Sequence, residues 1–344
     1  MAKAVALLSG GLDSTLAILV LLRQGIDVTA LTFLTHFGCD ISDSSSCSKN
    51  PYPAAEKFGF RVKLCHLSDQ FLEIVKNPKY GHGKNMNPCV DCRILMLKEA
   101  KRFMAMSGAD FLVTGEVLGQ RPMSQRKDSF PLIDREAEVQ GLVLRPLSAK
   151  LLKPTLPEIG GMVDRSQLYG FSGRSRRPQI ALAAEFGLSD YPPPAGGCLL
   201  TDPLYSARLR DLLSHASSPD VRDITLLRTG RHFRAPDGAK IIVGRDEKEN
   251  QFIESLSGLS DWVLIVEGFG SPLTVITGEP DEDALLLAAA ITARYSDAKR
   301  LGQVEVTASR GMAGPKTRVV VAPATDGILE THRVGKSQIA QKRR

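Results

Sequence analysis

The apolar and polar positions of the first part of the chain alternate between runs of strand length and runs of helix length. Residues 4–8 form a short apolar run that predicts a buried strand. The apolar run over residues 15–23 is too long for a typical strand and ends before Gly25, so it predicts a helix. Residues 28–34 predict a second strand. Strand, helix and strand in this order indicate a parallel sheet that binds its ligand at the carboxyl ends of the strands.

The remaining elements divide the chain into two regions of different character. In the first region, strands are expected at residues 60–67, 111–113 and 143–147, and helices at residues 54–58, 93–104 and 180–186. In the second, strands are expected near residues 231–243, 262–267, 273–277 and 304–316, with an Ala- and Leu-rich helix at residues 281–294. The pattern predicts a parallel-sheet α/β domain followed by a smaller α+β domain. We place the first domain at residues 1–205, a linker at 206–225, the second domain at 226–330 and a basic tail at 331–344.

Length and composition limit the class of protein. The chain has 344 residues, of which 43% are hydrophobic, so it can bury two cores. No apolar run approaches the roughly 18 residues of a membrane helix, and the first three residues leave no room for a signal peptide. We therefore expect a soluble, cytoplasmic protein with no membrane partner. The net charge of +6 fits a polyanionic partner but by itself proves nothing.

A glycine-rich segment at residues 9–14 lies between the first strand and the first helix. Glycines in such a turn let backbone N–H groups approach a phosphate, and the helix N-terminus adds partial positive charge. Asp13 beside a phosphate indicates a bridging divalent cation such as Mg²⁺. The segment is neither a Walker loop nor a dinucleotide fingerprint, because the lysine and the glycine spacing of those motifs are missing. The residues expected to bind the nucleotide phosphates are Ser9, Gly10, Gly11, Asp13 and Ser14. The alternative is a Gly-Gly turn with an ordinary helix cap.

The sequence SGGLDS at residues 9–14 resembles the PP-loop of the ATP pyrophosphatases (HUP, or adenine nucleotide alpha hydrolase-like, fold). Enzymes of this superfamily split ATP between the α and β phosphates and attach AMP to a substrate oxygen. The resemblance implies ATP as a cofactor and places adenine near the main chain of Phe33. In tRNA 2-thiouridylases a Thr-Gly pair lines the ATP site, and Thr114 and Gly115 match it. Glu116 stands where those enzymes usually have a histidine.

Three cysteines are candidates for the sulfur chemistry. Cys89 and Cys92 form a Cys-x-x-Cys pair at the start of a predicted helix, where the helix dipole favours thiolates. The segment Asn-Pro-Cys-Val-x-Cys resembles bacterial tRNA 2-thiouridylases, which carry a second catalytic cysteine about a hundred residues later. Cys198 lies at a similar separation, after three prolines and two glycines. We expect Cys89, Cys198 and Asp13 to be catalytic. Cys39 and Cys47 are interpreted as incidental thiols and Cys65 as a core residue.

Two mechanisms for these cysteines remain open. In the first, Cys89, Cys92 and Cys198 hold a [4Fe-4S] cluster whose fourth iron binds hydrosulfide, as in the iron–sulfur-dependent tRNA thiolases that this cysteine set resembles. In the second, one cysteine carries a persulfide and another releases its sulfur by forming a disulfide. We favour the cluster, because a two-cysteine mechanism gives Cys92 no part. A zinc site completed by Asp91 or water is a third alternative.

Basic residues indicate where RNA would bind. Arg174, Arg176 and Arg177 lie in the run Gly-Arg-Ser-Arg-Arg, and arginine pairs with phosphate through two hydrogen bonds. The second domain resembles the NFACT RNA-binding module in its Val-Gly-Arg-x-x-x-x-Asn segment, which contains Arg245, in its Ala-rich helix and in the strand at residue 304. We expect this module to replace the RNA-binding region that precedes the PP-loop in 4-thiouridine synthases. The alternative is an appendage used for dimerisation.

Together these observations predict an ATP-dependent tRNA thiolase that adenylates a uridine oxygen and then transfers sulfur. Product 4-thiouridine and product 2-thiouridine both remain open, with a preference for the former because of the domain layout. The rival enzyme is a PP-loop protein that adenylates a small molecule and has structural cysteines. A nucleotide-regulated RNA-binding protein without chemistry is the second rival. The sulfur donor, sulfide or a persulfide-carrying protein, and the oligomeric state are not readable from the sequence.

Overall fold

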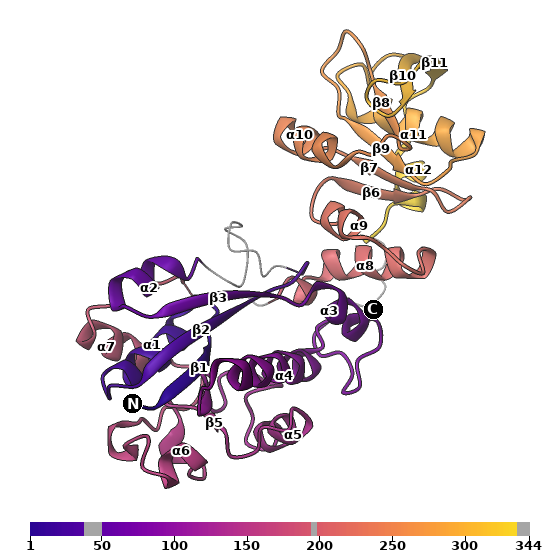
Figure 1. Ribbon diagram of the computed structural model, residues 1–344. Helices are drawn as coiled ribbons and strands as arrows, with labels where there is room; N and C mark the ends of the chain where they lie inside the picture. Colours follow the sequence, from indigo (N-terminus) through magenta and orange to yellow (C-terminus); the bar gives the residue numbers. More distant parts are fainter. Residues whose placement is uncertain (38–49, 194–197, 336–344) are drawn as a thin grey trace. The chain divides into compact units, whose positions relative to one another are not determined.

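The structure is a computed structural model that describes residues 1–37, 50–193 and 198–335 (Figure 1). It divides into two compact units, Met1–Thr201 and Asp202–Arg344, each with its own sheet. Cys39 and Cys47, residues 194–197 of the segment before Cys198, and the end of the basic tail lie outside the described residues. None of the helices in the described ranges has both the length and the hydropathy of a membrane span.

The N-terminal unit is built on a parallel sheet, as the sequence predicted. The sheet has five strands in the order β3-β2-β1-β4-β5. Its strands are β1 (Lys3–Leu7), β2 (Asp27–Leu34), β3 (Arg61–His66), β4 (Phe111–Thr114) and β5 (Val143–Leu144). Its helices are α1 (Leu12–Leu22), α2 (Tyr52–Phe58), α3 (Ser68–Lys76), α4 (Cys89–Ser107), α5 (Ser129–Glu136), α6 (Leu156–Ile159) and α7 (Arg177–Glu185). Single turns of 3-10 helix lie at Ala149–Leu151, Arg165–Gln167 and Leu199–Thr201.

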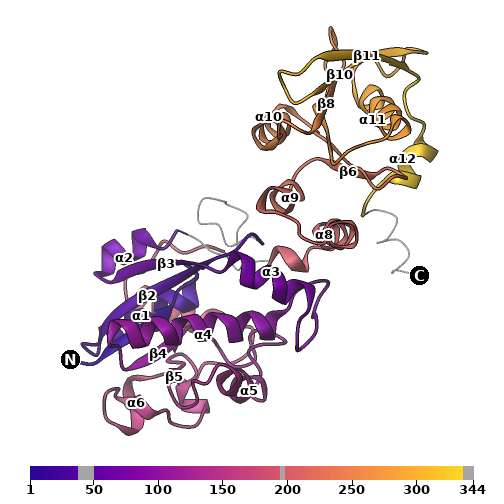
Figure 2. The same ribbon diagram turned by 45° about the vertical axis from the view of Figure 1, so that its right-hand side comes forward.

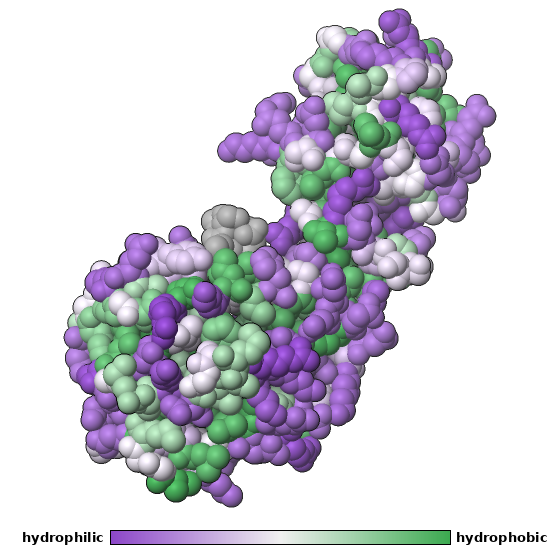
Figure 3. All heavy atoms as spheres, viewed as in Figure 1, coloured by the Kyte–Doolittle hydropathy of each residue, from purple (hydrophilic) through white to green (hydrophobic). Residues whose placement is uncertain are grey.

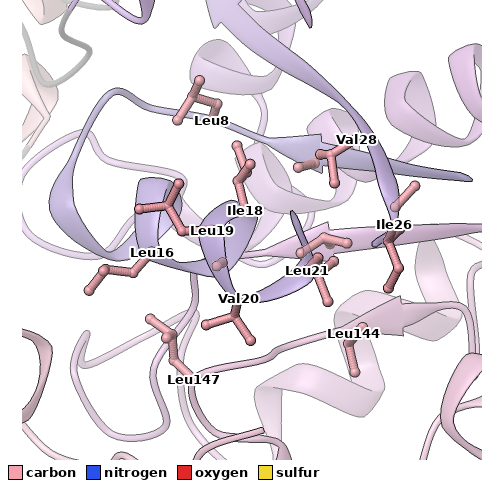
Figure 4. Packing of buried hydrophobic residues seen from close by; sticks show 14 of the residues in the cluster. Leu8, Leu16, Ile18, Leu19, Val20, Leu21, Ile26, Val28, Leu144 and Leu147 are labelled. Atoms are coloured by element: carbon pink, nitrogen blue, oxygen red, sulfur yellow. The ribbon is translucent and has the colours of Figure 1, made fainter. Parts of the chain in front are cut away.

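Both faces of this sheet are covered by helices, so its central strands are apolar on both sides. In β1, Ala4 and Ala6 belong to the core cluster that α1, α2 and α7 complete. The alternate residues Val5 and Leu7 are also buried but lie outside that cluster, because successive side chains of a strand point to opposite faces. Figure 4 shows the packing of α1 residues in this cluster against Leu8 and Val28. The edge strand β3 is more exposed, and Cys65 on it is only half-buried rather than a core residue.

The C-terminal unit is a six-stranded antiparallel sheet with helices, the α+β architecture predicted from the sequence. Its strand order is β11-β10-β8-β9-β7-β6. The strands are β6 (Arg231–Arg234), β7 (Lys240–Val243), β8 (Trp262–Ile265), β9 (Thr274–Thr277), β10 (Val304–Arg310) and β11 (Lys316–Val321). The helices are α8 (Pro203–His215), α9 (Val221–Leu226), α10 (Glu247–Leu256), α11 (Glu282–Tyr295) and α12 (Asp326–His332).

Two separate apolar clusters lie on the two faces of this second sheet. Helix α11 supplies Ala284, Ala288, Ala289 and Ala293 to the larger cluster, and α9 and α10 supply Leu226 and Ile253 to the smaller one. Figure 2 shows α10 and α11 on opposite sides of the strands. On the face drawn in Figure 3, hydrophilic side chains cover most of this unit. Residues 206–225, expected to be a linker, contain most of α8 and the first part of α9.

Candidate active site at the carboxyl edge of the parallel sheet

The glycine-rich segment forms the turn from β1 into α1. Gly10 has a φ of 69°, a left-handed conformation that glycine adopts without strain. Gly11 is the N-cap of α1 and provides no side-chain cap, so the first N–H groups of the helix have no partner within it. The hydroxyls of Ser9 and Ser14 lie 3.2 Å apart, and Ser14 also donates to the carbonyl of Gly11 at 3.0 Å. This arrangement can bind an anionic group such as a phosphate.

Three adjacent strands bring the remaining nucleotide candidates to the same edge. In the sheet register, Leu7 pairs with Leu31 of β2 and with Thr114 of β4. Phe33 is buried and lies two residues past the last pair between β1 and β2. A Cβ atom on Gly115 would lie 2.5 Å from the backbone N and Cα of Ser14. The Thr-Gly pair and the glycine-rich turn are therefore in direct contact, and only glycine fits at position 115.

The carboxylate of Asp13 is buried, and neighbouring groups stabilise its negative charge only in part. Burial raises its pKa, although Gln120, Arg176, Arg121 and Gln179 act in the opposite direction. Gln120 donates to Oδ2 at 3.0 Å, whereas the buried Oδ1 has no hydrogen-bond partner among the described residues. A buried carboxylate oxygen without a partner suits a hard cation, so Asp13 fits the Mg²⁺ role expected from the sequence.

Residues 119–125 form a loop that contacts both halves of the candidate site. Gly119 donates its N–H to the carbonyl of Gln125 at 2.7 Å and closes the loop. The side chain of Gln120 donates a hydrogen bond to Asp13 Oδ2 at 3.0 Å. Near the other end of the loop, Ser124 accepts a hydrogen bond from Cys89 Sγ at 3.3 Å. The phosphate turn and the cysteine pair are thus joined through one short segment. These two contacts were not predicted from the sequence.

The Gly-Arg-Ser-Arg-Arg run lies against the same loop but its arginines have different surroundings. The N–H of Gly173 donates to the carbonyl of Leu118 at 2.7 Å. Arg176 is half-buried and close enough to Asp13 to lower the pKa of that carboxyl. Arg174 and Arg177 are exposed. The three arginines, predicted as one RNA-binding group, therefore divide into one beside the phosphate turn and two on the surface.

Gln179, on the first turn of α7, is a candidate that sequence reasoning missed. It is fully buried and lies close enough to Asp13 to stabilise its carboxylate. Neither of its amide atoms meets a partner at hydrogen-bond geometry among the described residues. A buried amide without partners is costly unless a ligand satisfies it. The only signal in the sequence was a glutamine near the start of a predicted helix, which is too common to single out.

Cys89 and Cys92 lie one helical turn apart at the start of α4, and both are half-buried. The next residue, Arg93, is paired with Glu116, with 3.3 Å between Nε and Oε1. Burial alone would lower the pKa of Arg93, but Glu116 and the thiols of Cys92 and Cys89 outweigh it and raise the pKa. A guanidinium that stays positively charged therefore lies beside the two thiols.

Glu116 is the centre of a buried ionic network. It is 2% exposed, accepts a hydrogen bond from Thr114 Oγ1 at 3.1 Å and pairs with Arg145 Nε at 3.1 Å. Arg145 is bound in turn by both carboxylate oxygens of Asp134, at 2.7 and 3.0 Å. The carboxylate at the position of the usual histidine thus links the nucleotide strand to the arginine beside the cysteines. Arg93 and Arg145 were not predicted, because distant charges show no pairing in a sequence.

Cys198 lies on a segment that is hydrogen-bonded to the residues preceding Cys89. Met86 donates its N–H to the carbonyl of Leu200 at 3.1 Å, and the Asn85 side chain donates to the carbonyl of Thr201 at 2.7 Å. Cys198 Sγ itself lies 3.7 Å from the carbonyl oxygen of Phe37. Within the described ranges, no three cysteine, histidine or carboxylate side chains come together as a metal-binding group. The three cysteines share a region but are not assembled around a metal position.

Two family models match the chain. Residues 1–151 match "Thiamine biosynthesis protein (ThiI)", and residues 230–333 match "NFACT protein RNA binding domain". These matches confirm both resemblances drawn from the sequence: a PP-loop domain of the tRNA-thiolase type, followed by an NFACT-type RNA-binding domain.

Similar proteins include tRNA-modifying enzymes. A tRNA-specific 2-thiouridylase, MnmA, of Sulfurimonas denitrificans is 32% identical over 123 residues, which cover 34% of this chain and 36% of that protein. A probable tRNA sulfurtransferase of Thermococcus kodakarensis is 28% identical over 145 residues, covering 42% and 36%. The chain spans about a third of the length of these curated relatives. A solved structure described as a 4-thiouridine synthetase–RNA complex with bound ATP is 23% identical, covering 56% of this chain and 51% of that chain, with a TM-score of 0.35.

Proposed function

We propose that this chain, with its ThiI-type PP-loop domain and its NFACT-type RNA-binding domain, is an ATP-dependent tRNA sulfurtransferase. The observation that carries the proposal is the loop at residues 119–125, which binds Asp13 of the phosphate turn and Cys89 of the cysteine pair. A site for splitting ATP and a site for thiol chemistry are useful together when an oxygen has to be activated and then replaced by sulfur. Uridine in tRNA is the proposed substrate, because the relatives include a tRNA-specific 2-thiouridylase and the second domain matches an RNA-binding domain.

The first half-reaction is adenylation. A uridine carbonyl oxygen attacks the α-phosphate of ATP, the bond between the α and β phosphates breaks, and pyrophosphate leaves. We propose that the N-terminal amides of α1 and the hydroxyls of Ser9 and Ser14 bind the leaving phosphates. Asp13 would hold Mg²⁺, which neutralises the charge that develops on pyrophosphate. Arg176, which lies near Asp13, is proposed as a further phosphate contact.

The second half-reaction is sulfur transfer. Hydrosulfide or a persulfide attacks the activated carbon of the base, the carbon–sulfur bond forms, and AMP leaves with the former carbonyl oxygen. We propose that Cys89 and Cys198 deliver the sulfur, with the positive charge of Arg93 close to Cys89 at the start of α4. We favour 4-thiouridine as the product, because a PP-loop domain combined with an RNA-binding domain resembles the layout of 4-thiouridine synthases.

For the sulfur site we propose that Cys89, Cys92 and Cys198 hold a [4Fe-4S] cluster. The support is the donor set, three thiols on segments that are hydrogen-bonded to each other. Such a cluster supplies an open iron for hydrosulfide. The described residues contain no assembled metal-binding group, and neither half-reaction requires the cluster. The alternative is a persulfide on one cysteine, released as a disulfide forms with another, which then requires a reductant.

The decisive experiment is nucleoside analysis of unmodified tRNA after incubation with the protein, ATP, Mg²⁺ and sulfide under anaerobic conditions. We expect AMP and pyrophosphate in step with a thiolated uridine, whose mass and retention time identify the 4- or 2-thio product. The variant Asp13→Asn should abolish pyrophosphate release, and Cys198→Ala should stop thiolation while adenylation continues. Asp69→Asn, on α3, is a control with unchanged activity. Pyrophosphate release that is independent of RNA would refute the proposal and favour the small-molecule enzyme.

Iron and acid-labile sulfide assays on anaerobically purified protein separate the two sulfur mechanisms. About four irons per chain, lost in Cys198→Ala, are expected for the cluster. An iron-free protein that still thiolates tRNA would exclude the cluster and leave the persulfide mechanism.

A further inference from the structure

We propose that one corner of the C-terminal sheet binds the phosphate backbone of RNA through Arg231, Arg245 and Arg333, with Arg208 adding positive charge from beneath. This inference rests on the proposed function, because it names the surface through which the second domain would hold tRNA. Of these four residues, the sequence pointed only to Arg245.

The topology of the sheet brings two of the arginines together. Arg231 is the first residue of β6, an edge strand, and it pairs with Val243, the last residue of β7. Arg245 follows that position by two residues. The side chain of Arg231 donates to the carbonyl of Gly244 at 2.9 Å, so the two arginines flank the same turn of the chain.

The other two arginines reach this corner from distant parts of the sequence. Arg333, after α12, forms an isolated antiparallel bridge with Phe233 of β6, two residues from Arg231. Arg208, on α8, donates to the carbonyl of Gly230 at 2.8 Å, directly before β6 begins. The arginines thus come from four separate segments and meet at one end of β6.

The positive charge of this cluster is only partly compensated, because Glu249 and Asp202 are the carboxylates that act on Arg208 and only Glu249 acts on Arg231. Within the described part of the chain, Arg208, Arg231 and Arg333 form no salt bridge, and Arg245 pairs with Glu249. Burial lowers the pKa of Arg208 to about 10, and Arg245 and Arg333 contribute to the decrease. Burial also lowers the pKa of Arg231, and Arg333 and Arg245 add to the effect. An anion bound here would relieve this repulsion.

Two of the guanidinium groups are held in fixed positions by aromatic rings. Arg231 lies over the ring of Tyr295 with 4.3 Å between Cζ and the ring centre, and Arg333 lies 5.8 Å above the ring of Phe233. Arg231 and Arg333 are half-buried, and 51% of the Arg245 side chain is exposed. Arginines held in place by rings and carbonyls lose less entropy on binding a phosphate than free side chains do.

At the opposite edge of the same sheet, basic residues are paired with carboxylates. On β11, Arg318 pairs with Glu305 at 3.4 Å and Lys316 pairs with Glu267 at 2.7 Å. Basic residues occur at both edges, but among the described residues each of these two β11 residues has its own carboxylate partner, whereas Glu249 is the one carboxylate that forms a salt bridge with the four arginines of the β6 corner. This contrast favours the β6 corner as the phosphate-binding surface and provides a control within the same domain.

The test measures binding of unmodified tRNA to the full chain by fluorescence anisotropy at salt concentrations from 50 to 200 mM, a range of roughly fourfold. Each of Arg245→Gln and Arg333→Gln should weaken binding and reduce the slope of log K against log salt by about 0.7 to 0.9, because one phosphate contact is lost. The double variant should lose about twice that. Arg318→Gln is the matched control and should keep the wild-type slope.

The outcomes distinguish this inference from the proposed function. A double variant with the slope of the wild type would overturn the β6 corner as the RNA-binding surface, while thiolation by the wild type would leave the proposed function intact. Failure of the wild type to bind tRNA at any salt concentration would overturn both. Thermal melting of each variant monitors the fold, and Arg333→Lys, which keeps the charge, should restore most of the slope.

Discussion

The side-chain amide of Gln120 donates to Oδ2 of Asp13 at 3.0 Å, across 107 positions of the sequence. This bond holds one oxygen of the buried carboxylate and leaves Oδ1 for another ligand. It also fixes one end of the loop whose other end contacts Cys89. The relationship makes Gln120 a positioning residue for the proposed Mg²⁺ ligand.

Gln120→Ala should therefore impair adenylation without preventing nucleotide binding. The expected result is a fall in the rate of pyrophosphate release of about tenfold, the effect of losing roughly 1.4 kcal/mol of stabilisation. Raising the Mg²⁺ concentration should recover part of the rate, because the carboxylate still exists but is less well oriented. Steady-state pyrophosphate release over a range of Mg²⁺ concentrations measures this. An unchanged rate at limiting Mg²⁺ would contradict the role given to Gln120.

Gly115→Ala should disrupt the nucleotide turn. The new methyl group would lie 2.5 Å from the backbone of Ser14, so the strand end and the start of α1 would have to separate. We expect a loss of about 1 to 3 kcal/mol in the free energy of unfolding and no detectable ATP binding. Gly302→Ala is the control, since a Cβ there meets nothing within 4 Å. Denaturant unfolding and ATP titration test both variants, and normal ATP binding by Gly115→Ala would show that the contact is not needed.

Glu116→Gln should destabilise the N-terminal unit, because two guanidinium groups would then lose their shared carboxylate. Removal of one member of a buried ionic network costs about 3 to 5 kcal/mol. Glu185→Gln removes the exposed partner of Arg23 and should cost less than about 1 kcal/mol. Chemical denaturation compares the two. Equal effects would mean that the network around Glu116 contributes little.

The C-terminal unit should become more stable as the pH rises above 8. Burial lowers the pKa of Lys240 from 10.5 to about 8, and the positive charges of Arg234 and Arg208 add to this decrease, whereas Asp211 opposes it. The unfolded chain therefore binds a proton more tightly than the folded chain does. The resulting cost to folding is fully present below about pH 8 and is relieved as the pH rises toward the unfolded value of 10.5.

Lys240→Met should remove this dependence, because Asp211 keeps its pair with Arg234 and no ammonium group is buried. Thermal melting between pH 7.5 and about 9.5 should give a rising Tm for the wild type relative to the variant. Parallel curves for the two proteins would refute the assignment to Lys240.

The pattern of the sequence by itself determined the parallel sheet, the turn at residues 9–14 and the helix that begins at Cys89. Local periodicity decides strands and helices, and a glycine turn between a strand and a helix has few structural solutions. The Thr-Gly pair was expected at the nucleotide site from the resemblance to thiouridylases, and the structure places Gly115 against Ser14 because parallel strands end at the same edge of a sheet. The strands of the second domain were likewise indicated by runs of apolar residues, whereas their antiparallel pairing into one sheet came from the structure.

Only the tertiary structure decided which distant side chains meet. Gln120 with Asp13, Ser124 with Cys89 and Arg93 with Glu116 are contacts between segments that the sequence separates by tens of residues. A polar residue in a sequence gives no sign of its partner, since charge and hydrogen-bonding capacity have no periodicity. For the same reason, the sequence treated Arg174, Arg176 and Arg177 as one group. Their adjacency in the chain did not show that Arg176 alone lies near the buried carboxylate of Asp13.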